Sequence, residues 1–190
     1  SAENARRLID DILQLARHQE PVAQHPLNVE PLLREILSTL QPTFPERIHL
    51  TLSCASPLPS VQIDPSQFQR AIVNLLLNAR DAIEGEGTIA IEAAAHDLNT
   101  AVDGLERTLF PGRYLAITIT DSGAGISPEI MERVFEPFFT TKAAGQGSGI
   151  GLSSAYGIIV RAGGFMRLTS EPGKGSEFQI FLPVPPSAMA

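Results

Sequence analysis

The sequence predicts an α/β fold, in which amphipathic helices pack against a β-sheet. Two kinds of periodicity support this. Residues 65–83 repeat apolar side chains at helical spacing, whereas residues 88–95 and 114–121 have the pattern of strands. With 190 residues, of which 43% are hydrophobic, the chain can bury the core of one ordinary domain and carry a short attached segment.

Composition and charge exclude several classes of function. A net charge of −7 argues against nucleic acid as a partner, which would favour a basic face. Cys54 is the only cysteine, so no internal disulfide can form and a reducing compartment is permitted. No run approaches the roughly 18 apolar residues of a membrane span, and the N-terminus does not read as a signal peptide. We therefore expect a cytoplasmic chain, although a longer parent protein could be associated with a membrane.

The first third of the chain contains two predicted helices and two short strands. Residues 1–19 have helical spacing but no N-cap signal. After a break that extends to Pro26, Asn28 can cap a helix with one apolar face. Residues 48–53 alternate like a strand, and residues 61–63 form a shorter one.

A long helix and two strands follow. Residues 64–67 are a capping signal, with an acceptor at the N-cap, proline at the first helical position and glutamine three residues after the cap. This helix runs to about Ile83, and Gly85 stops it. The strands at 88–95 and 114–121 are joined by a segment that we interpret as a variable loop.

The last third begins with a short helix at Ser127. Residues 135–148 are rich in glycine and threonine, and we expect this segment to be mobile. A helix from about Gly151 ends at Gly163, and it is followed by two closing strands at 165–170 and 177–183.

The helix at 65–83 carries a polar stripe on an otherwise apolar surface, made of Gln67, Arg70, Asn74, Asn78 and Asp81. A stripe that faces solvent is one explanation. Asparagine, however, is a poor helix former, and a solvated stripe would more naturally use Glu, Lys or Gln. Side-chain amide oxygens suit a hard cation such as Mg²⁺ that keeps most of its waters. The stripe therefore indicates a metal site.

Asp121 lies at the end of a predicted strand and is followed by Gly123 and Gly125. A carboxylate in this position, with glycine beyond it, can approach a flat base closely. An Asx-turn between strand and helix is the alternative for an isolated Asp-x-Gly sequence.

Four glycines alternate just before the last predicted helix, at Gly145, Gly147, Gly149 and Gly151. Backbone N–H groups at a helix N-terminus favour anions, and glycine lets such a backbone reach phosphates without a Cβ in the way. A flexible linker is the alternative, but a linker would not run straight into an amphipathic helix. The chain has neither a P-loop motif nor a dinucleotide-binding glycine motif.

Four motifs occur in a fixed order: Asn-Leu-Leu-Leu-Asn-Ala-Arg-Asp at 74–81, Asp-Ser-Gly-Ala-Gly at 121–125, Phe-Glu-Pro-Phe-Phe at 135–139 and Gly-Gln-Gly-Ser-Gly-Ile-Gly at 145–151. Each is weak evidence alone. Together they resemble the ATP-binding catalytic domain of sensor histidine kinases, in the GHKL ATPase superfamily. The resemblance covers nearly the whole chain and is closest to the nitrogen-regulation and cell-cycle hybrid kinases. It implies an α/β two-layer sandwich, with a mixed sheet covered on one face by helices.

The resemblance implies that these motifs bind ATP and Mg²⁺. Asn78 would be the Mg²⁺ ligand, Asn74 would lie beside the phosphates, and Asp81 would support them or cap locally. Asp121 would accept a hydrogen bond from the adenine amino group. The other implied nucleotide contacts are Gly123, Gly125, Ile126, Phe135, Lys142, Gly145, Gly147, Ser148, Gly149, Ile150, Gly151, Leu152 and Ser176.

Some of these assignments have plain alternatives. Phe135 would anchor a lid over the nucleotide or belong to the core, and Lys142 would contact a phosphate or be a solvated lysine. Ser176 would reach the adenine through water, or its segment would be a simple hairpin turn. The chain departs from the usual motifs at Ser122, where Asn or Asp is common, and at Ile150, where Leu is common.

The resemblance also divides the chain. Residues 1–20 would be the end of the second helix of a dimerisation hairpin, although an ordinary surface helix also fits. Residues 21–184 would be the catalytic domain, and residues 185–190 a linker stub. Such kinases phosphorylate a histidine on the hairpin and pass the phosphoryl group to an aspartate of a response regulator receiver domain. No histidine here has the expected His-Glu-x-x-x-Pro context, His18 included, so we expect the acceptor upstream, in a homodimeric parent.

A clamp ATPase of the gyrase, mismatch-repair or chaperone type is the alternative function. Those relatives place a glutamate four residues before the metal-binding asparagine, as the general base for water. Here Asn74 holds that position, and its amide cannot take up a proton. A degenerate domain that binds nucleotide only for regulation is a weaker alternative, because the motifs are intact.

Overall fold

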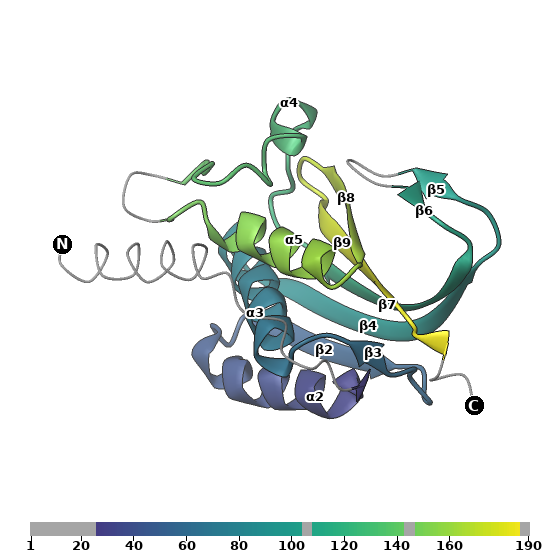
Figure 1. Ribbon diagram of the computed structural model, residues 1–190. Coiled ribbons are helices and arrows are strands. Elements are labelled where there is room, and N and C mark those ends of the chain that lie inside the picture. Colours follow the sequence, from purple (N-terminus) through teal and green to yellow (C-terminus); the bar gives the residue numbers. More distant parts are fainter. Residues whose placement is uncertain (1–25, 104–107, 143–146, 187–190) are drawn as a thin grey trace.

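A five-stranded mixed β-sheet forms the centre of the computed structural model, which describes residues 26–103, 108–142 and 147–186 (Figure 1). The strand order is β2-β4-β7-β9-β8. β2 runs parallel to β4, and the other neighbours pair antiparallel. The strands span Ile48–Cys54 (β2), Gly87–Leu98 (β4), Gly112–Asp121 (β7), Phe165–Glu171 (β8) and Gly175–Pro183 (β9).

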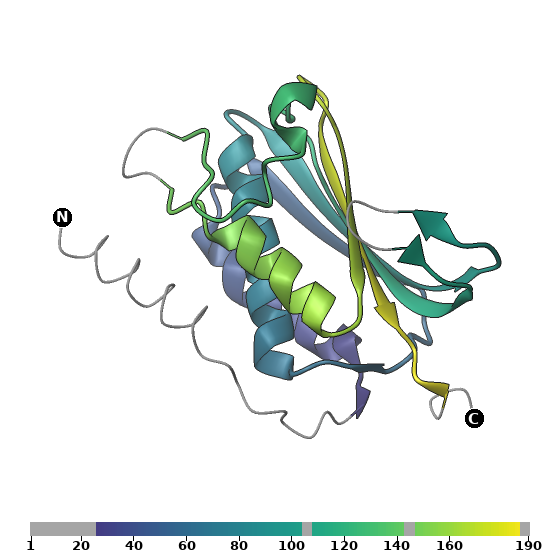
Figure 2. The same cartoon turned by 45° about the horizontal axis from the view of Figure 1, so that its top comes forward.

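Helices cover one face of this sheet, and in the part of the chain that the structure describes no helix covers the other face (Figure 2). They are α2 (Val29–Leu40), α3 (Pro65–Ala82) and α5 (Gly151–Arg161). A 3₁₀ turn, Gln41–Thr43, follows α2, and a short helix α4 (Pro128–Met131) lies between β7 and α5. The predicted two-layer sandwich, with a mixed sheet and helices on one face, is confirmed.

The predicted capping residues begin both long helices. The Asn28 side chain accepts a hydrogen bond from the Glu30 N–H at 3.1 Å. The Asp64 carboxylate accepts one from the Gln67 N–H at 2.9 Å, with Pro65 at the first helical position. These side chains satisfy N–H groups that have no partner within the helix.

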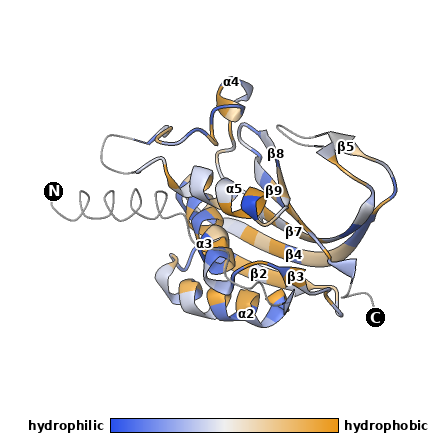
Figure 3. Cartoon of the chain, in the orientation of Figure 1, coloured by the Kyte–Doolittle hydropathy of each residue, from blue (hydrophilic) through white to orange (hydrophobic). Residues whose placement is uncertain are grey.

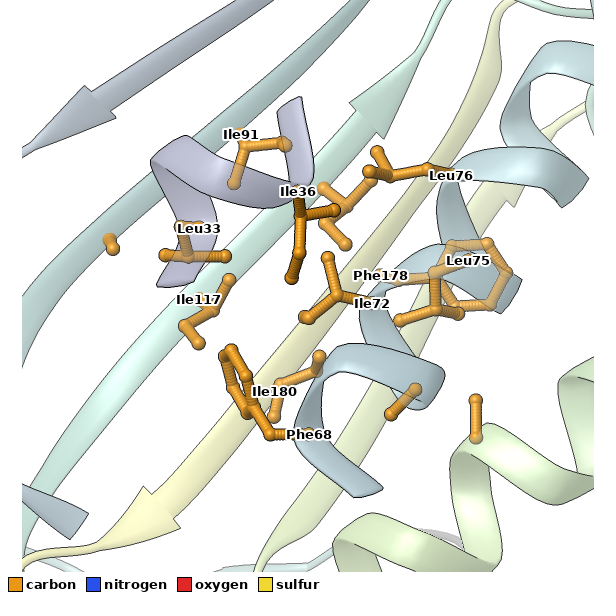
Figure 4. Close-up of a cluster of buried hydrophobic side chains, with 14 of the residues drawn as sticks. Leu33, Ile36, Phe68, Ile72, Leu75, Leu76, Ile91, Ile117, Phe178 and Ile180 are labelled. Carbon is orange, nitrogen blue, oxygen red and sulfur yellow. The ribbon is translucent and has the colours of Figure 1, made fainter. Parts of the chain in front are cut away.

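The core lies between the helices and the sheet, and α3 runs through its middle (Figure 4). In Figure 3, hydrophobic residues recur along the helices and alternate with more polar ones along the strands. The apolar side chains of α3 contact those of α2 and of the sheet. The labelled members of this core are Leu33, Ile36, Phe68, Ile72, Leu75, Leu76, Ile91, Ile117, Phe178 and Ile180.

The prediction of a variable loop between residues 95 and 114 is wrong in part. β4 continues to Leu98, and β7 begins at Gly112. Between them, β5 (Val102–Asp103) pairs with β6 (Thr108–Leu109). This extension carries polar and small residues such as His96 and Asp97, so it lacks the alternation that predicts a half-buried strand.

The predicted break before Asn28 also contains a short strand. β1 (Pro26–Leu27) pairs antiparallel with β3 (Val61–Gln62). Proline is tolerated here because β1 pairs on one side only.

The predicted hairpin helix at residues 1–20 and the predicted contact at Gly145 lie outside the described residues. Among the residues that are described, none of the helices has the length and hydrophobicity needed to cross a membrane.

Candidate functional site

A cavity of about 640 Å³ lies between α3, the N-terminal end of α5 and the segment that joins β7 to α5. It brings together motifs that are far apart in the sequence. Most of the predicted site residues line it: Asn74, Asn78, Asp81, Asp121, Gly125, Ile126, Lys142, Gly147, Ser148, Gly149, Ile150, Gly151, Leu152 and Ser176.

Two predicted contacts, Phe135 and Gly123, do not line the cavity. The Phe135 ring instead packs against Tyr156 of α5, with the ring centroids 4.9 Å apart. Gly123 lies against the end of α3, where a Cβ would stand 2.6 Å from the Ala82 carbonyl oxygen. Both residues therefore shape the walls of the cavity without facing it.

The polar stripe of α3 faces this cavity over most of its length. Arg70, Asn74, Asn78 and Asp81 line it, and Gln67, at the start of the helix, does not. The opposite side of the helix is buried in the core, so the amphipathic pattern of α3 orients the two asparagine amides toward the cavity.

Asp121 is at once part of a turn and part of the cavity wall. One carboxylate oxygen accepts a hydrogen bond from the Gly123 N–H at 2.8 Å, which is the Asx-turn. The residue is only 4% exposed, yet it lines the cavity. Burial raises the pKa of the Asp121 carboxyl, and hydrogen bonds from the backbone N–H groups of Gly123 and Ser176 oppose this rise. The two interpretations of Asp121 are therefore compatible.

Two serines tie the walls of the cavity together. The Ser122 hydroxyl accepts a hydrogen bond from the Thr88 N–H at 2.9 Å, so this departure from the usual motif keeps a local hydrogen bond. The Ser170 hydroxyl accepts from the Ile126 N–H at 2.8 Å and donates to the Gly175 carbonyl at 2.8 Å. The Ser170 hydroxyl also lies 3.0 Å from the Ser176 hydroxyl. Its hydrogen bond with the Ile126 N–H fixes the backbone of Ile126.

The segment that precedes α5 is closed by a backbone pair. The Phe138 N–H donates to the Gly149 carbonyl at 3.0 Å. Both residues have left-handed backbones, with φ of 69° at Phe138 and 67° at Gly149. A Cβ at Gly149 would collide with the Phe138 and Phe139 backbone, so this close approach requires glycine.

Lys142 is held by Asp81 across the mouth of the cavity. Its Nζ lies 2.6 Å from one Asp81 oxygen, and Arg80 binds the other oxygen at 2.6 Å. Burial alone would raise the pKa of the Asp81 carboxyl, but the hydrogen bonds and charges of Lys142 and Arg80 together hold it below its usual range. Asp81 therefore forms ion pairs with two basic side chains of the cavity.

The N-terminal end of α5 faces the cavity with backbone groups. No side chain of the described residues caps this helix at Ile150, and Gly151 and Leu152 line the cavity. A Cβ at Gly151 would stand 3.8 Å from the side chain of Asn74, so the helix end lies directly above the amide stripe. The first N–H groups of a helix are suited to an anion.

Comparison with known families assigns the chain to a protein family. Residues 63–186 match the histidine kinase-, DNA gyrase B-, and HSP90-like ATPase family. The chain belongs to this family. It is an ATP-binding domain of this type, as the four motifs predicted.

The relatives of this ATPase domain are sensor kinases. It is 36% identical over 183 residues to the sensor kinase CckA of Brucella abortus (strain 2308). The aligned region covers 96% of this chain and 19% of CckA. It is also 34% identical to the sensor histidine kinase ZraS of Salmonella typhimurium and 30% identical to ZraS of Escherichia coli (strain K12). The chain covers 36% of the length of each of these two proteins. The chain thus covers about a fifth to a third of the curated relatives that it matches.

Solved structures share the fold of this ATPase domain. Full-length ShkA in complex with AMPPNP matches with a TM-score of 0.73 and 26% identity, over 93% of this chain and 35% of ShkA. Histidine kinase ThkA, solved in complex with the response regulator protein TrrA, matches with a TM-score of 0.72 and 23% identity, over 98% of this chain and 49% of that one. The second likeness shows the fold alone.

The donor set of this ATPase domain fits a cation that keeps most of its ligands as water and phosphate oxygens. Among the described residues, no group of three or more His, Cys, Asp and Glu could hold a metal ion. Asn78 offers one amide oxygen at the cavity wall. Mg²⁺ is commonly bound by one or two protein oxygens plus substrate phosphates, so the site is compatible with it.

Several cavity residues of this ATPase domain were missed by the sequence analysis. Phe139, Thr140 and Ser154 line the cavity, and Ser170 supports it. Phe139 and Thr140 belong to the aromatic motif and its extension, which could have identified them. Ser154 and Ser170 carry no sequence signal, because their roles depend on which way α5 and β8 face.

Proposed function

We propose that this chain is the catalytic part of a sensor histidine kinase, which binds Mg²⁺-ATP and donates its γ-phosphoryl group to a histidine on a dimerisation hairpin. The observation that carries the proposal is the cavity itself. It combines a buried carboxylate at one end with amides and exposed helix N–H groups at the other. The sensor kinases among its relatives support the same assignment.

Each wall of the cavity has a proposed task. The Asp121 carboxylate accepts a hydrogen bond from the adenine amino group, and Ile126, fixed by Ser170, packs on the ring. The first N–H groups of α5 and the Gly147–Gly151 backbone donate to the phosphates. Asn78 would hold Mg²⁺, which supplies neutralisation of the phosphate charge. The side chains thus bind and orient the nucleotide for transfer.

The position of Asn74 distinguishes the kinase from a clamp ATPase. Asn74 lies under the N-terminal end of α5, beside the proposed phosphate site. A water-activating base in that place needs a carboxylate, and an amide can only offer hydrogen bonds. The chain would therefore spare ATP for a histidine acceptor.

We further propose that the partners are the parent protein's own hairpin and a response regulator receiver domain. The parent would be a homodimer whose catalytic part lies in the cytoplasm. ThkA, whose fold this chain shares, was solved with its response regulator protein.

Calorimetry with ATP and ADP, with and without Mg²⁺, tests the nucleotide site. Asp121→Ala should lose at least about tenfold in affinity for either nucleotide, because a hydrogen bond to the base is lost. Asn78→Ala should lose mainly the Mg²⁺-dependent part of the affinity. Asp97→Ala, which removes an exposed aspartate away from the cavity, is the matched control. Unchanged affinity in Asp121→Ala would overturn the adenine assignment.

A further inference from the structure

Three basic side chains line the described part of the cavity: Arg70, Arg80 and Lys142. Two of them already have a carboxylate, since Asp81 binds both Arg80 and Lys142 at 2.6 Å. Arg70 differs from them. It is half-buried, and no carboxylate among the described residues lies within ion-pair distance of it. A positive charge that lines a cavity without a carboxylate partner is available to an anionic ligand.

The position of Arg70 along α3 indicates which part of a ligand it meets. The end of α3 marks the base side of the cavity, because the Ala124 N–H of the Asp121–Gly125 turn donates to the Ala82 carbonyl at 2.8 Å. Asn74 marks the phosphate side, because Gly151 of α5 lies above it. A nucleotide in the proposed site would run along α3 from Ala82 toward Asn74.

Arg70 is one helical turn further in the same direction. A helix rises 1.5 Å per residue, so the Cα of Arg70 lies about 6 Å beyond that of Asn74 along the axis. Helical side chains lean toward the N-terminus, which places the Asn74 amide over the turn that carries Arg70. Arg70 is therefore next to the far end of the phosphate chain.

We propose that Arg70 binds the terminal phosphoryl group of the nucleotide and so makes the cavity prefer a nucleoside triphosphate to a diphosphate. This inference rests on the proposed function, which sets the direction of the nucleotide. A guanidinium group presents a planar fork of N–H donors that matches two phosphate oxygens at once. Lys142 is less suited to this role, because it must first leave Asp81.

Calorimetric titration of the whole chain with Mg²⁺-AMPPNP and with Mg²⁺-ADP tests the proposal. Arg70→Ala should weaken AMPPNP binding by roughly tenfold or more, and ADP binding by less than about twofold, because ADP lacks the group that Arg70 contacts. Arg70→Lys should recover part of the affinity for AMPPNP, as a point charge replaces the fork. Arg167→Ala, which removes a positive charge from an exposed position of β8, is the control for net charge.

The alternative outcomes separate the inference from the proposed function. Two results would show that Arg70 does not bind the terminal phosphoryl group: equal AMPPNP affinity of Arg70→Ala and the parent, or an equal loss of ADP and AMPPNP affinity in Arg70→Ala. Either result would leave the proposed nucleotide site unaffected. If the parent chain binds neither nucleotide, the proposed function fails together with the inference. Thermal melting of each variant shows whether the fold is retained.

Discussion

The contacts of Asp81 are of two kinds, some with neighbours on its own helix and one with a residue far away in the sequence. The polar stripe predicted that Asp81 would lie beside the two asparagines, because helical spacing alone decides this. Its partner Lys142 is 61 residues away, and no periodicity or motif spacing reveals such a pair. The same holds for the hydrogen bond between Ser170 and Ile126, which depends on the packing of β8 against the Asp121–Gly125 turn.

The depressed pKa of Asp81 predicts a pH-dependent contribution to stability. A carboxyl group with a lowered pKa in the folded state stabilises the fold above its ordinary pKa, and this contribution is lost as the pH falls through the folded-state pKa. Asp81→Asn should therefore be less stable than the parent at pH 7, by at most about 1 kcal/mol because the pair is partly exposed. The difference should shrink at pH 3.

Urea unfolding at both pH values measures this difference. Glu171→Gln is the control, because it removes a more exposed ion pair with Lys174 that should contribute little. A gap between Asp81→Asn and the parent that stays constant from pH 7 to pH 3 would contradict the assignment to charge.

At the scale of elements, local signals were predictable and non-local ones were not. The N-caps at Asn28 and Asp64 depend on only a few consecutive residues, and both helices begin as predicted. β5 and β6 were missed, because they are two residues long and their pairing is decided by the neighbouring long strands. The turns that bring β7 and α5 to the cavity depend on glycines whose conformation is visible only in the fold.

Gly125 should be far less tolerant of substitution than Gly173, although both have a positive φ, of 69° and 79°. A Cβ at Gly173 meets nothing within 4 Å, so Gly173→Ala should cost only the left-handed strain, about 1 kcal/mol. A Cβ at Gly125 would collide with the Glu171 carbonyl, so Gly125→Ala should cost at least about 2 kcal/mol more. Chemical denaturation of both variants measures the difference, and equal costs would show that the turn can move aside.

Nucleotide binding should protect the segment around the aromatic and glycine motifs. Residues 139–142 and 147–150 line the cavity and have few regular hydrogen bonds, so their amides should exchange quickly without ligand. Hydrogen exchange with and without Mg²⁺-AMPPNP measures this, with the amides of β7 as an internal reference. Protection that does not change in this segment would show that it does not close over the nucleotide.

At the scale of the whole molecule, the sequence predicted the architecture because four motifs occur in the fixed order of a known family. The fold class and family are confirmed. The arrangement of charge inside the cavity was not predictable. It results from three basic and three acidic side chains, of which Arg70, Arg80 and Asp81 lie on α3 and the others lie elsewhere in the chain, and composition gives only their sum.

The isolated chain should bind ATP without turning it over at a rate typical of enzymes. Phosphoryl transfer needs an aligned nucleophile, and Asn74 cannot activate water. Adding a hairpin that carries an acceptor histidine, in trans or as a longer chain, should yield a phosphohistidine that is labile in acid and stable in base. Radiolabelled ATP detects both the product and any free phosphate. Steady hydrolysis by the chain alone, abolished in Asn78→Ala, would favour the clamp ATPase.

The bond between Phe138 and Gly149 has a consequence for how this protein family can vary. It joins the two ends of the intervening segment, so the cavity wall on either side is held independently of what lies between. The entropy of closing such a loop grows only with the logarithm of its length, and doubling the length costs about 0.6 kcal/mol. A change in the length of the tied loop should therefore cost the domain little stability and leave the base side of the cavity in place, while it shifts the cavity residues inside the loop, among them Lys142, Gly147 and Ser148.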